Sequence, residues 1–131
     1  MAQPCRWCGV EACRDRFDEC LALDFSDARY GAVHHLTAHT YALQHRIYTD
    51  GFEVTVAGFL LDHLEQPPTP GAMRALTADV DGGTRVRREE PGPPPSEPTG
   101  PSVADVVTDT PETYRASVRA WAQSVAERFV D

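Results

Sequence analysis

The sequence predicts a mainly α protein, a small helical bundle with a cysteine knuckle at its N-terminus and a Pro-rich surface loop. Three observations lead to this prediction. Apolar residues recur at three- and four-residue steps over several segments, which is the spacing of one helix face. Two cysteines stand in a Cys-x-x-Cys-Gly start, and six prolines lie between Pro91 and Pro101. One helical core with two irregular segments accounts for all three.

The first two predicted helices form a hairpin. The first covers residues 13–23, and its apolar and small side chains share one face: Cys13, Phe17, Cys20 and Leu21. It should stop near Ser26-Asp27, where a capping side chain opens a second helix over residues 28–45. Because the link between them is so short, the two helices should lie antiparallel.

The next elements are a buried helix and a proline-broken segment. Residues 52–64 are too apolar for a surface element, so we expect a mostly buried third helix there. Pro67, Pro68 and Pro70 should end it, because proline lacks a backbone donor and clashes with the preceding turn. A short helical turn is expected around residues 72–76.

The C-terminal half combines a loop and a long helix. Residues 91–101 hold no large apolar side chain to bury and should run as an extended surface loop. A stiff connector is the favoured role, and recruitment of a proline-recognising partner is the alternative. A last helix over residues 111–130 begins with Thr110 as N-cap and Pro111 in its first turn. One apolar stripe on this helix should pack in the core: Tyr114, Val118, Trp121, Val125 and Phe129.

Length and charge limit the possible classes of protein. At 131 residues and 14.4 kDa the chain fits one domain, residues 1–131, with a metal knuckle over 1–13, a helical core over 13–65, the loop and the last helix. Its net charge of −8 disfavours nucleic acid and anionic membrane surfaces as partners. The basic run at Arg85, Arg87 and Arg88 leads straight into two glutamates and is interpreted as a solvated charged turn.

The start of the chain also bears on its compartment. It has neither the basic nor the apolar region of a secretion signal, and no apolar run approaches the roughly 20 residues of a membrane span. We therefore expect a cytoplasmic protein. In a reducing compartment its four cysteines should be thiols or thiolates rather than two disulfides.

Sulfur and imidazole donors concentrate in the first third of the chain, a combination that suits a tetrahedral Zn²⁺ ion. Cys5 and Cys8 have the spacing at which a tight loop directs two sulfurs to one point, and Gly9 allows the chain to turn just after them. Redox pairs share this spacing, but the preceding strand and Trp-Cys opening of thioredoxin-like sites are missing. The first hypothesis is therefore an N-terminal zinc knuckle.

Helix geometry selects the remaining zinc ligands. Cys13 is the third, because it lies near the knuckle at a helix N-terminus, where partial positive charge favours a thiolate. Cys20 is roughly 10 Å further along the helix and is expected to be a small buried residue. If the first helix folds back on the second, Cys13 comes level with about His39, and the knuckle lies toward His45. His45 is the first choice for the fourth ligand.

Other histidines remain as alternatives. His39 is the near alternative to His45, and His34 would need the knuckle to fold back along the helix pair. His35 and His39, four residues apart, could also clamp one ion together. A polar patch or pocket beside the site could orient the ligand histidine and comprises these residues: His34, Thr37, Tyr41 and Gln44.

These motifs resemble a family of small bacterial proteins of unknown function, with a Cys-x-x-Cys-Gly start and a central His-x-Leu-Thr-x-x-x-Tyr-x-x-Gln-His segment. The matching residues here are Cys5, Cys8, Gly9, His34, Leu36, Thr37, Tyr41, Gln44 and His45. The resemblance spans nearly the whole chain and implies the fold rather than a reaction. At His35 the family tends to have a basic residue and at His39 an acidic one, so a shared metal site on this pair is not implied.

Two metal-dependent functions remain open on the sequence alone, and a purely interacting protein with free cysteines is the third alternative. Three cysteines and one histidine would close a structural zinc site and make the protein a binding or accessory module for an unknown protein or small molecule. A zinc-dependent hydrolase or group transferase would instead need an open coordination position and a pocket near His34, Tyr41 and His45, with Asp24 as a nearby acid. No known catalytic motif supports the enzyme.

Overall fold

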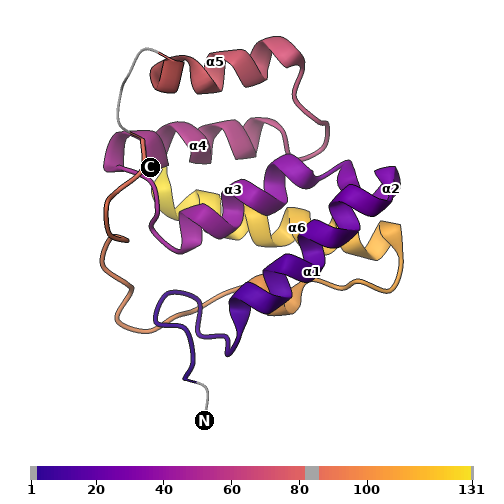
Figure 1. Ribbon diagram of the computed structural model, residues 1–131, viewed down its shortest axis with the longest axis horizontal. Helices are drawn as coiled ribbons and strands as arrows, with labels where there is room; N and C mark the ends of the chain where they lie inside the picture. The colour runs from indigo at the N-terminus through magenta and orange to yellow at the C-terminus, as the bar shows by residue number, and fades with distance from the viewer. Residues whose placement is uncertain (1–2, 82–85, 131) are drawn as a thin grey trace.

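The computed structural model describes residues 3–81 and 86–130, and the predicted mainly α fold is confirmed there (Figure 1). The helices are α1 (Cys13–Ser26), α2 (Ala28–Gly31), α3 (His34–Gln44), α4 (Asp50–Asp62), α5 (Pro70–Asp81) and α6 (Pro111–Ala126), with short 3₁₀ helices η1 (Val103–Asp105) and η2 (Glu127–Phe129). Helices α3, α4 and α6 pack against one another in the middle. Helix α1 crosses one side of this group, and α5 lies outermost on α4.

The hairpin of the first two predicted helices is only partly correct. The first helix ends at Ser26, and the Asp27 carboxylate accepts a hydrogen bond from the Arg29 backbone N–H at 2.9 Å, as a cap should. The predicted continuous helix over 28–45 is wrong, because the chain breaks it at Ala32 and Val33 into α2 and α3. Gly31 explains the tight path, since a Cβ there would lie 2.4 Å from the Asp24 carbonyl oxygen.

Helices α4 and α5 differ from their predictions mainly in extent. Helix α4 runs two residues earlier than the predicted 52–64 and buries one apolar face: Phe52, Val56, Ala57 and Leu60. The short turn predicted over 72–76 is a full helix, Pro70–Asp81. It begins where the Thr69 hydroxyl accepts a hydrogen bond from the Ala72 backbone N–H at 3.1 Å. Pro70 therefore starts a helix rather than ending one, which is the favoured place for proline.

Helix α6 supplies the largest buried side chains. Thr110 and Thr113 form a reciprocal capping box at its start, with Pro111 in the first turn as predicted. Four residues of the predicted core stripe are fully buried along the helix, namely Tyr114, Val118, Trp121 and Val125. The fifth, Phe129, lies in η2 and is only partly buried against the core. The helix ends at Ala126, and the predicted last residues continue as η2 instead.

The segment before α6 is extended but firmly held. Residues 91–101 contain no helix or strand, as predicted. Gly92 is nevertheless buried and donates its backbone N–H to the Arg46 carbonyl oxygen at 2.8 Å. The Gln44 side chain reaches the same segment and donates to the Pro101 carbonyl oxygen at 3.1 Å. The backbone of the loop is thus hydrogen-bonded to residues at the end of α3. The amino-acid composition of the loop does not reveal these bonds.

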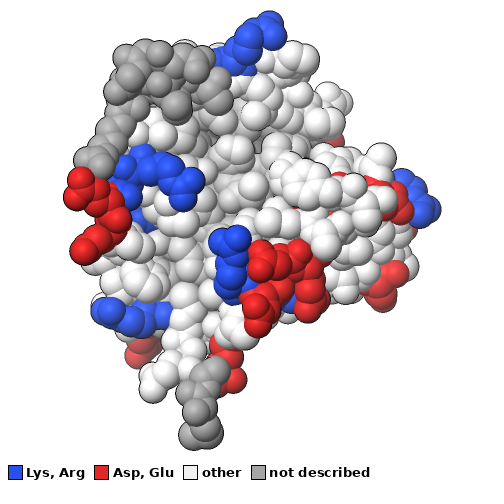
Figure 2. All heavy atoms as spheres, viewed as in Figure 1, with Lys and Arg blue, Asp and Glu red and all other residues white. Residues whose placement is uncertain are grey.

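The prediction of a solvated charged turn is wrong for Arg88. Its guanidinium pairs with Asp50 and lies 3.5 Å from the buried carboxylate of Glu53, and it also donates to the Tyr48 carbonyl oxygen. Arg85 lies outside the described residues. On the face in Figure 2, basic side chains stand in separate places rather than in a stripe. None of the described helices has both the length and the apolar character needed to cross a bilayer.

Candidate metal centre

The knuckle is a tight loop that ends just before α1. The Gly9 N–H donates to the Cys5 carbonyl oxygen at 2.8 Å, and the Cys5 N–H donates to the Val10 carbonyl oxygen at 3.1 Å. Gly9 has a φ of 81°, and Ala12, immediately before α1, also has a positive φ of 53°. The two left-handed residues reverse the chain so that Cys5 and Cys8 turn back toward the first residue of α1.

The antiparallel course of α1 and α3 brings Cys13 and His45 together. Cys13 is the first residue of α1 and His45 the residue just after α3, and the Cys13 Sγ atom lies 3.6 Å from the His45 Nε2 atom. The His45 Nδ1 atom lies 2.7 Å from the Tyr41 carbonyl oxygen, so Nδ1 carries the proton and donates. Nε2 is left with its lone pair facing the sulfur, which is the form of imidazole that binds a metal.

Four donor atoms converge at this point. The Sγ atoms of Cys5, Cys8 and Cys13 and a ring nitrogen of His45 all lie within 4.8 Å of one another. In a tetrahedral zinc site, ligand distances of about 2.0–2.3 Å separate the donors by about 3.3–3.8 Å. The four side chains therefore lie within metal-binding distance of one another. All four cysteines of the chain are free of disulfides.

Burial opposes negative charge on this cluster unless a cation compensates it. Burial raises the pKa of the Cys8 thiol to about 12. Burial also acts to raise the pKa of Cys5, but hydrogen bonds from the backbone of Cys8 and Trp7 outweigh it and lower that pKa. Burial lowers the pKa of His45, which keeps the imidazole neutral. A soft divalent cation would replace the thiol protons and balance the thiolate charge.

Tyr41 is the only residue of the predicted polar patch that touches the cluster. Its hydroxyl lies 3.6 Å from the Cys13 Sγ atom. Its ring stacks between Phe17, at 3.9 Å between ring centroids, and His45, at 4.1 Å. Tyr41 therefore holds the His45 ring in place both by stacking and through its backbone carbonyl.

The other members of the predicted patch lie elsewhere along α3. Thr37 donates to the Val33 carbonyl oxygen at 3.2 Å, inside its own helix. The Gln44 side-chain oxygen accepts from the buried Trp121 indole N–H at 2.9 Å. His34 faces Asp24, with the His34 Nδ1 atom 2.8 Å from a carboxylate oxygen. The patch is therefore three separate contacts rather than one pocket.

The alternative histidine ligands are occupied away from the cluster. His39 Nδ1 lies 2.9 Å from the His35 carbonyl oxygen, and the His39 ring lies near the aromatic rings of Tyr48 and Phe59. His35 uses its Nε2 atom on the His63 carbonyl oxygen at 2.8 Å. His35 and His39 thus each bond to a backbone carbonyl oxygen rather than acting together as a metal-binding pair.

Residues 3–129 match the profile of DUF5946, described as a family of unknown function. The chain belongs to this family. The resemblance predicted from the sequence is therefore confirmed at the level of the family. No curated protein and no solved structure matches the chain.

Two residues of this DUF5946 protein matter more than the sequence suggested. Asp24 is buried, and its carboxylate accepts from the Tyr114 hydroxyl at 2.6 Å as well as facing His34. Helix α1 carries it away from Cys13, so it is not an acid beside the cluster. Trp7, between two clustered cysteines, donates its indole N–H to the Gly92 carbonyl oxygen at 2.9 Å. In the sequence, only the presence of a tryptophan between the two cysteines could have indicated such a contact.

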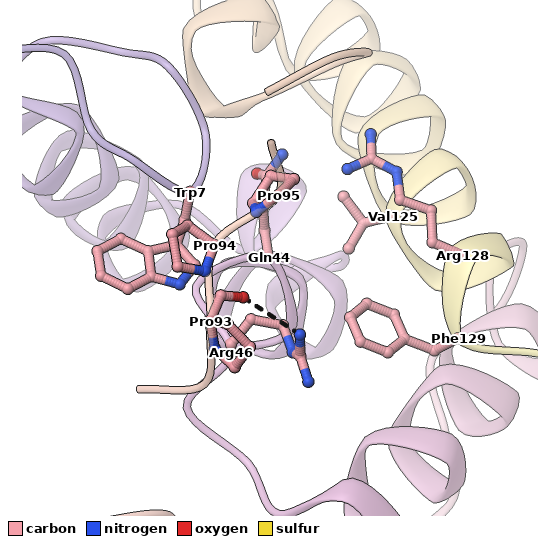
Figure 3. A pocket seen from close by; sticks show the side chains of 9 residues that line it. All are labelled: Trp7, Gln44, Arg46, Pro93, Pro94, Pro95, Val125, Arg128 and Phe129. Atoms are coloured by element: carbon pink, nitrogen blue, oxygen red, sulfur yellow. Dashed lines mark hydrogen bonds between the residues drawn. The ribbon is translucent and has the colours of Figure 1, made fainter. Parts of the chain in front are cut away.

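Trp7 also forms one wall of a cavity of about 310 Å³ (Figure 3). The opposite wall comes from the C-terminal end of α6 and from η2, through Val125, Arg128 and Phe129. Three prolines of the loop and two α3-end residues complete the lining: Pro93, Pro94, Pro95, Gln44 and Arg46. The cavity thus lies where the knuckle, the Pro-rich loop and the end of the chain meet.

Proposed function

We propose that this DUF5946 protein binds one Zn²⁺ ion through Cys5, Cys8, Cys13 and His45, and that the ion is mainly structural. The convergence of three sulfurs and one imidazole nitrogen within 4.8 Å is the observation that carries this proposal. Zinc is the favoured ion because this donor set is that of closed tetrahedral zinc sites. Four protein ligands fill the tetrahedron and leave no position for a substrate.

The ion would join the N-terminal knuckle to α1 and α3, which already pack against each other. The knuckle supplies two ligands, the start of α1 one, and the residue after α3 the last. Zinc binding in knuckle peptides is worth about 10–16 kcal/mol, which is as large as the whole stability of an ordinary domain, about 5–15 kcal/mol. The metal can therefore decide whether the N-terminal segment is ordered.

The same ion would support the Pro-rich loop, which points to a binding or accessory role. Trp7 holds the loop at Gly92, and Gly9 lies so close to it that a Cβ would be 3.2 Å from the Pro98 Cβ. The cavity of Figure 3 depends on this contact for one wall, and it has the volume of a small ligand site. A small molecule or a protein partner in the cytoplasm, rather than nucleic acid or a membrane, is the binding partner in this proposal, since the net charge is −8.

A zinc-dependent hydrolase or transferase fits the geometry less well. It would need a pocket near His34, Tyr41 and His45, but the His34 ring is engaged with Asp24 on another part of α3. The cavities beside the knuckle are lined by other residues, with Cys5 bordering one of them. An activated water would also need one of the four ligands to leave the ion.

The test is the metal content of protein purified without added metal, followed by X-ray absorption spectroscopy at the zinc edge. We expect about one zinc per chain with three sulfur ligands and one nitrogen ligand. Cys8→Ser should lose the zinc and melt at a lower temperature. Cys20→Ala is the matched control, because Cys20 is fully buried outside the cluster, and it should keep the zinc.

Two results would overturn the structural-zinc proposal. The first is that the purified parent protein contains no metal and that Cys8→Ser melts at the same temperature as the parent. The cluster would then not be a metal site. A bound zinc with only three protein ligands and one water oxygen would instead favour the enzyme.

A further inference from the structure

A second polar cavity lies at the other end of α3 from the cysteine cluster. It has a volume of about 180 Å³ and lies where α3 begins, where the chain leaves α4, and against one face of α6. Its apolar lining consists of Ala32, Val33, Leu64 and Pro67, and its polar lining of His35, Glu65, Gln66, Arg115 and Arg119. The cavity is thus a small, partly open space lined by two arginines.

Neither arginine has an acidic partner in the described part of the chain. Arg115 donates from Nη1 to the Arg29 carbonyl oxygen at 2.7 Å, and Arg119 donates from Nε to the Leu64 carbonyl oxygen at 2.9 Å. Each bond uses one of the five N–H groups of a guanidinium, so most donors of both side chains remain available. A neutral carbonyl fixes the position of each group without cancelling its charge.

This arrangement leaves two positive charges without a carboxylate partner in a chain with an excess of acidic residues. The protein has 20 acidic and 12 basic residues, so carboxylates are plentiful as partners. Arg115 and Arg119 are nevertheless one helical turn apart on α6, where like charges repel. Both are only partly exposed, which weakens the screening of their charges by water. An anion between them would remove the repulsion and use the free donors.

The size of the cavity selects the kind of anion. A volume of about 180 Å³ holds about six water molecules at about 30 Å³ each. This is less than the roughly 300–1,000 Å³ of sites for larger organic ligands. One guanidinium group can donate two parallel hydrogen bonds to two oxygens of a phosphate or carboxylate. These bonds are shorter and stronger than those from neutral donors.

We propose that this cavity binds a small oxyanion of the size of inorganic phosphate between the Arg115 and Arg119 guanidinium groups. Gln66 can add an amide donor from the turn after α4. His35 forms part of the wall, because its Nε2 proton is already donated to the His63 carbonyl oxygen. Glu65 at the same cavity opposes the anion and limits its affinity. The anion is either free phosphate or the phosphate group of a small phosphomonoester.

The proposal is tested by calorimetric titration of the full-length protein with inorganic phosphate, against chloride at equal ionic strength. We expect saturable binding of one phosphate per chain and at least tenfold weaker binding in Arg115→Gln and in Arg119→Gln. Arg14→Gln is the matched control, because Arg14 is an exposed arginine that pairs with Asp18 on α1, and it should bind phosphate like the parent. Phenyl phosphate separates the two sources: a free-phosphate site excludes the phenyl group, whereas a phosphomonoester site binds it at least as well.

Glu65→Gln tests whether the cavity binds an anion, because it removes a negative charge from the lining without removing a hydrogen-bond donor. It should tighten phosphate binding severalfold, and it decides the question even if an arginine variant fails to fold. No binding at millimolar phosphate, equal weakening in Arg14→Gln, or weaker binding in Glu65→Gln would overturn the proposal. Zinc content measured on the same samples keeps this test separate from the structural-zinc proposal, since the arginine variants should keep their zinc.

Discussion

His45 shows how one residue can serve both the fold and a candidate metal centre. Its backbone ends α3, its Nδ1 atom donates to Tyr41, and its Nε2 atom faces Cys13. The hydrogen bond fixes the tautomer, so the Nε2 lone pair faces the Cys13 sulfur. His39, six residues earlier, instead turns its ring toward Tyr48 and Phe59. Local backbone geometry therefore separates two histidines that look alike in the sequence.

The burial of His39 predicts a pH dependence of stability. Burial lowers the pKa of His39 below its ordinary value of 6.5, so the unfolded chain binds a proton at a higher pH than the folded one. The His39 contribution to stability is then fully present above about pH 6.5 and is lost as the pH falls through the lower folded pKa. As the pH falls from 7 to 5, the melting temperature of His39→Gln should therefore decrease less than the melting temperature of the parent protein. Equal slopes for the two proteins would contradict this.

At the scale of single elements, the start of α6 is a self-contained cap. The Thr110 hydroxyl accepts from the Thr113 backbone N–H at 3.2 Å, and the Thr113 hydroxyl accepts from the Thr110 backbone N–H at 3.3 Å. We expect Thr110→Ala to reduce the free energy of unfolding by about 1 kcal/mol, measured by urea denaturation. Thr110→Ser keeps the hydroxyl and should stay close to the parent. A loss of similar size in Thr110→Ser would show that the cap is not the cause.

The contact between α3 and α6 includes one buried hydrogen bond within a largely apolar interface. Gln44 accepts from the Trp121 indole N–H at 2.9 Å, and Trp121 is fully buried. Gln44→Leu should cost about 1–3 kcal/mol in the free energy of unfolding, because it leaves the indole N–H without a partner. The double variant with Trp121→Phe removes that orphaned donor, so the two losses should not add. Simple additivity in urea denaturation would rule out this coupling.

At the scale of the whole molecule, the candidate metal centre, the loop and the last helix form one chain of contacts. Trp7 joins the knuckle to Gly92, Gly92 joins the loop to Arg46, and the Arg46 guanidinium lies over the Phe129 ring. Arg46 itself has a positive φ of 56°, a strained conformation that its pairing with the buried Glu53 at 2.7 Å helps to hold. A loss of order in the knuckle should therefore weaken contacts as far as Phe129 in η2.

Removal of the metal should reveal this dependence. A strong zinc chelator should lower the melting temperature by about 10 °C or more, since several kcal/mol of binding energy are lost. Hydrogen exchange should rise in the knuckle and in residues 91–101, whereas the buried middle of α6 should stay protected. Adding zinc back should reverse both effects. Exchange that rises equally in α6, or not at all in the loop, would contradict the proposed link.

The sequence alone determined the kinds of element and the candidate donors, because residue type and spacing are local properties. Apolar stripes, helix caps and apolar runs located five of the six α-helical regions, although α2 and α3 were expected as one helix. The sequence offered Cys5, Cys8 and Cys13 with His45 as first choice and His39 or His34 as alternatives, and the structure brings His45 to the three cysteines. The sequence could not locate the break at Ala32, because that depends on how closely Gly31 approaches the end of α1. It also missed the full length of α5, whose start uses Thr69 and Pro70.

Tertiary structure decided which polar groups meet across the sequence. Trp7 with Gly92, Asp24 with Tyr114, and Arg88 with Glu53 are each far apart along the chain, and no local pattern pairs them. The same holds for the two cavities, which are spaces left between elements rather than properties of any one of them. Side-chain type and spacing are encoded locally, but burial and pairing arise only when the helices pack. This is why the candidate donors could be proposed from the sequence, whereas the surroundings of the cluster could not.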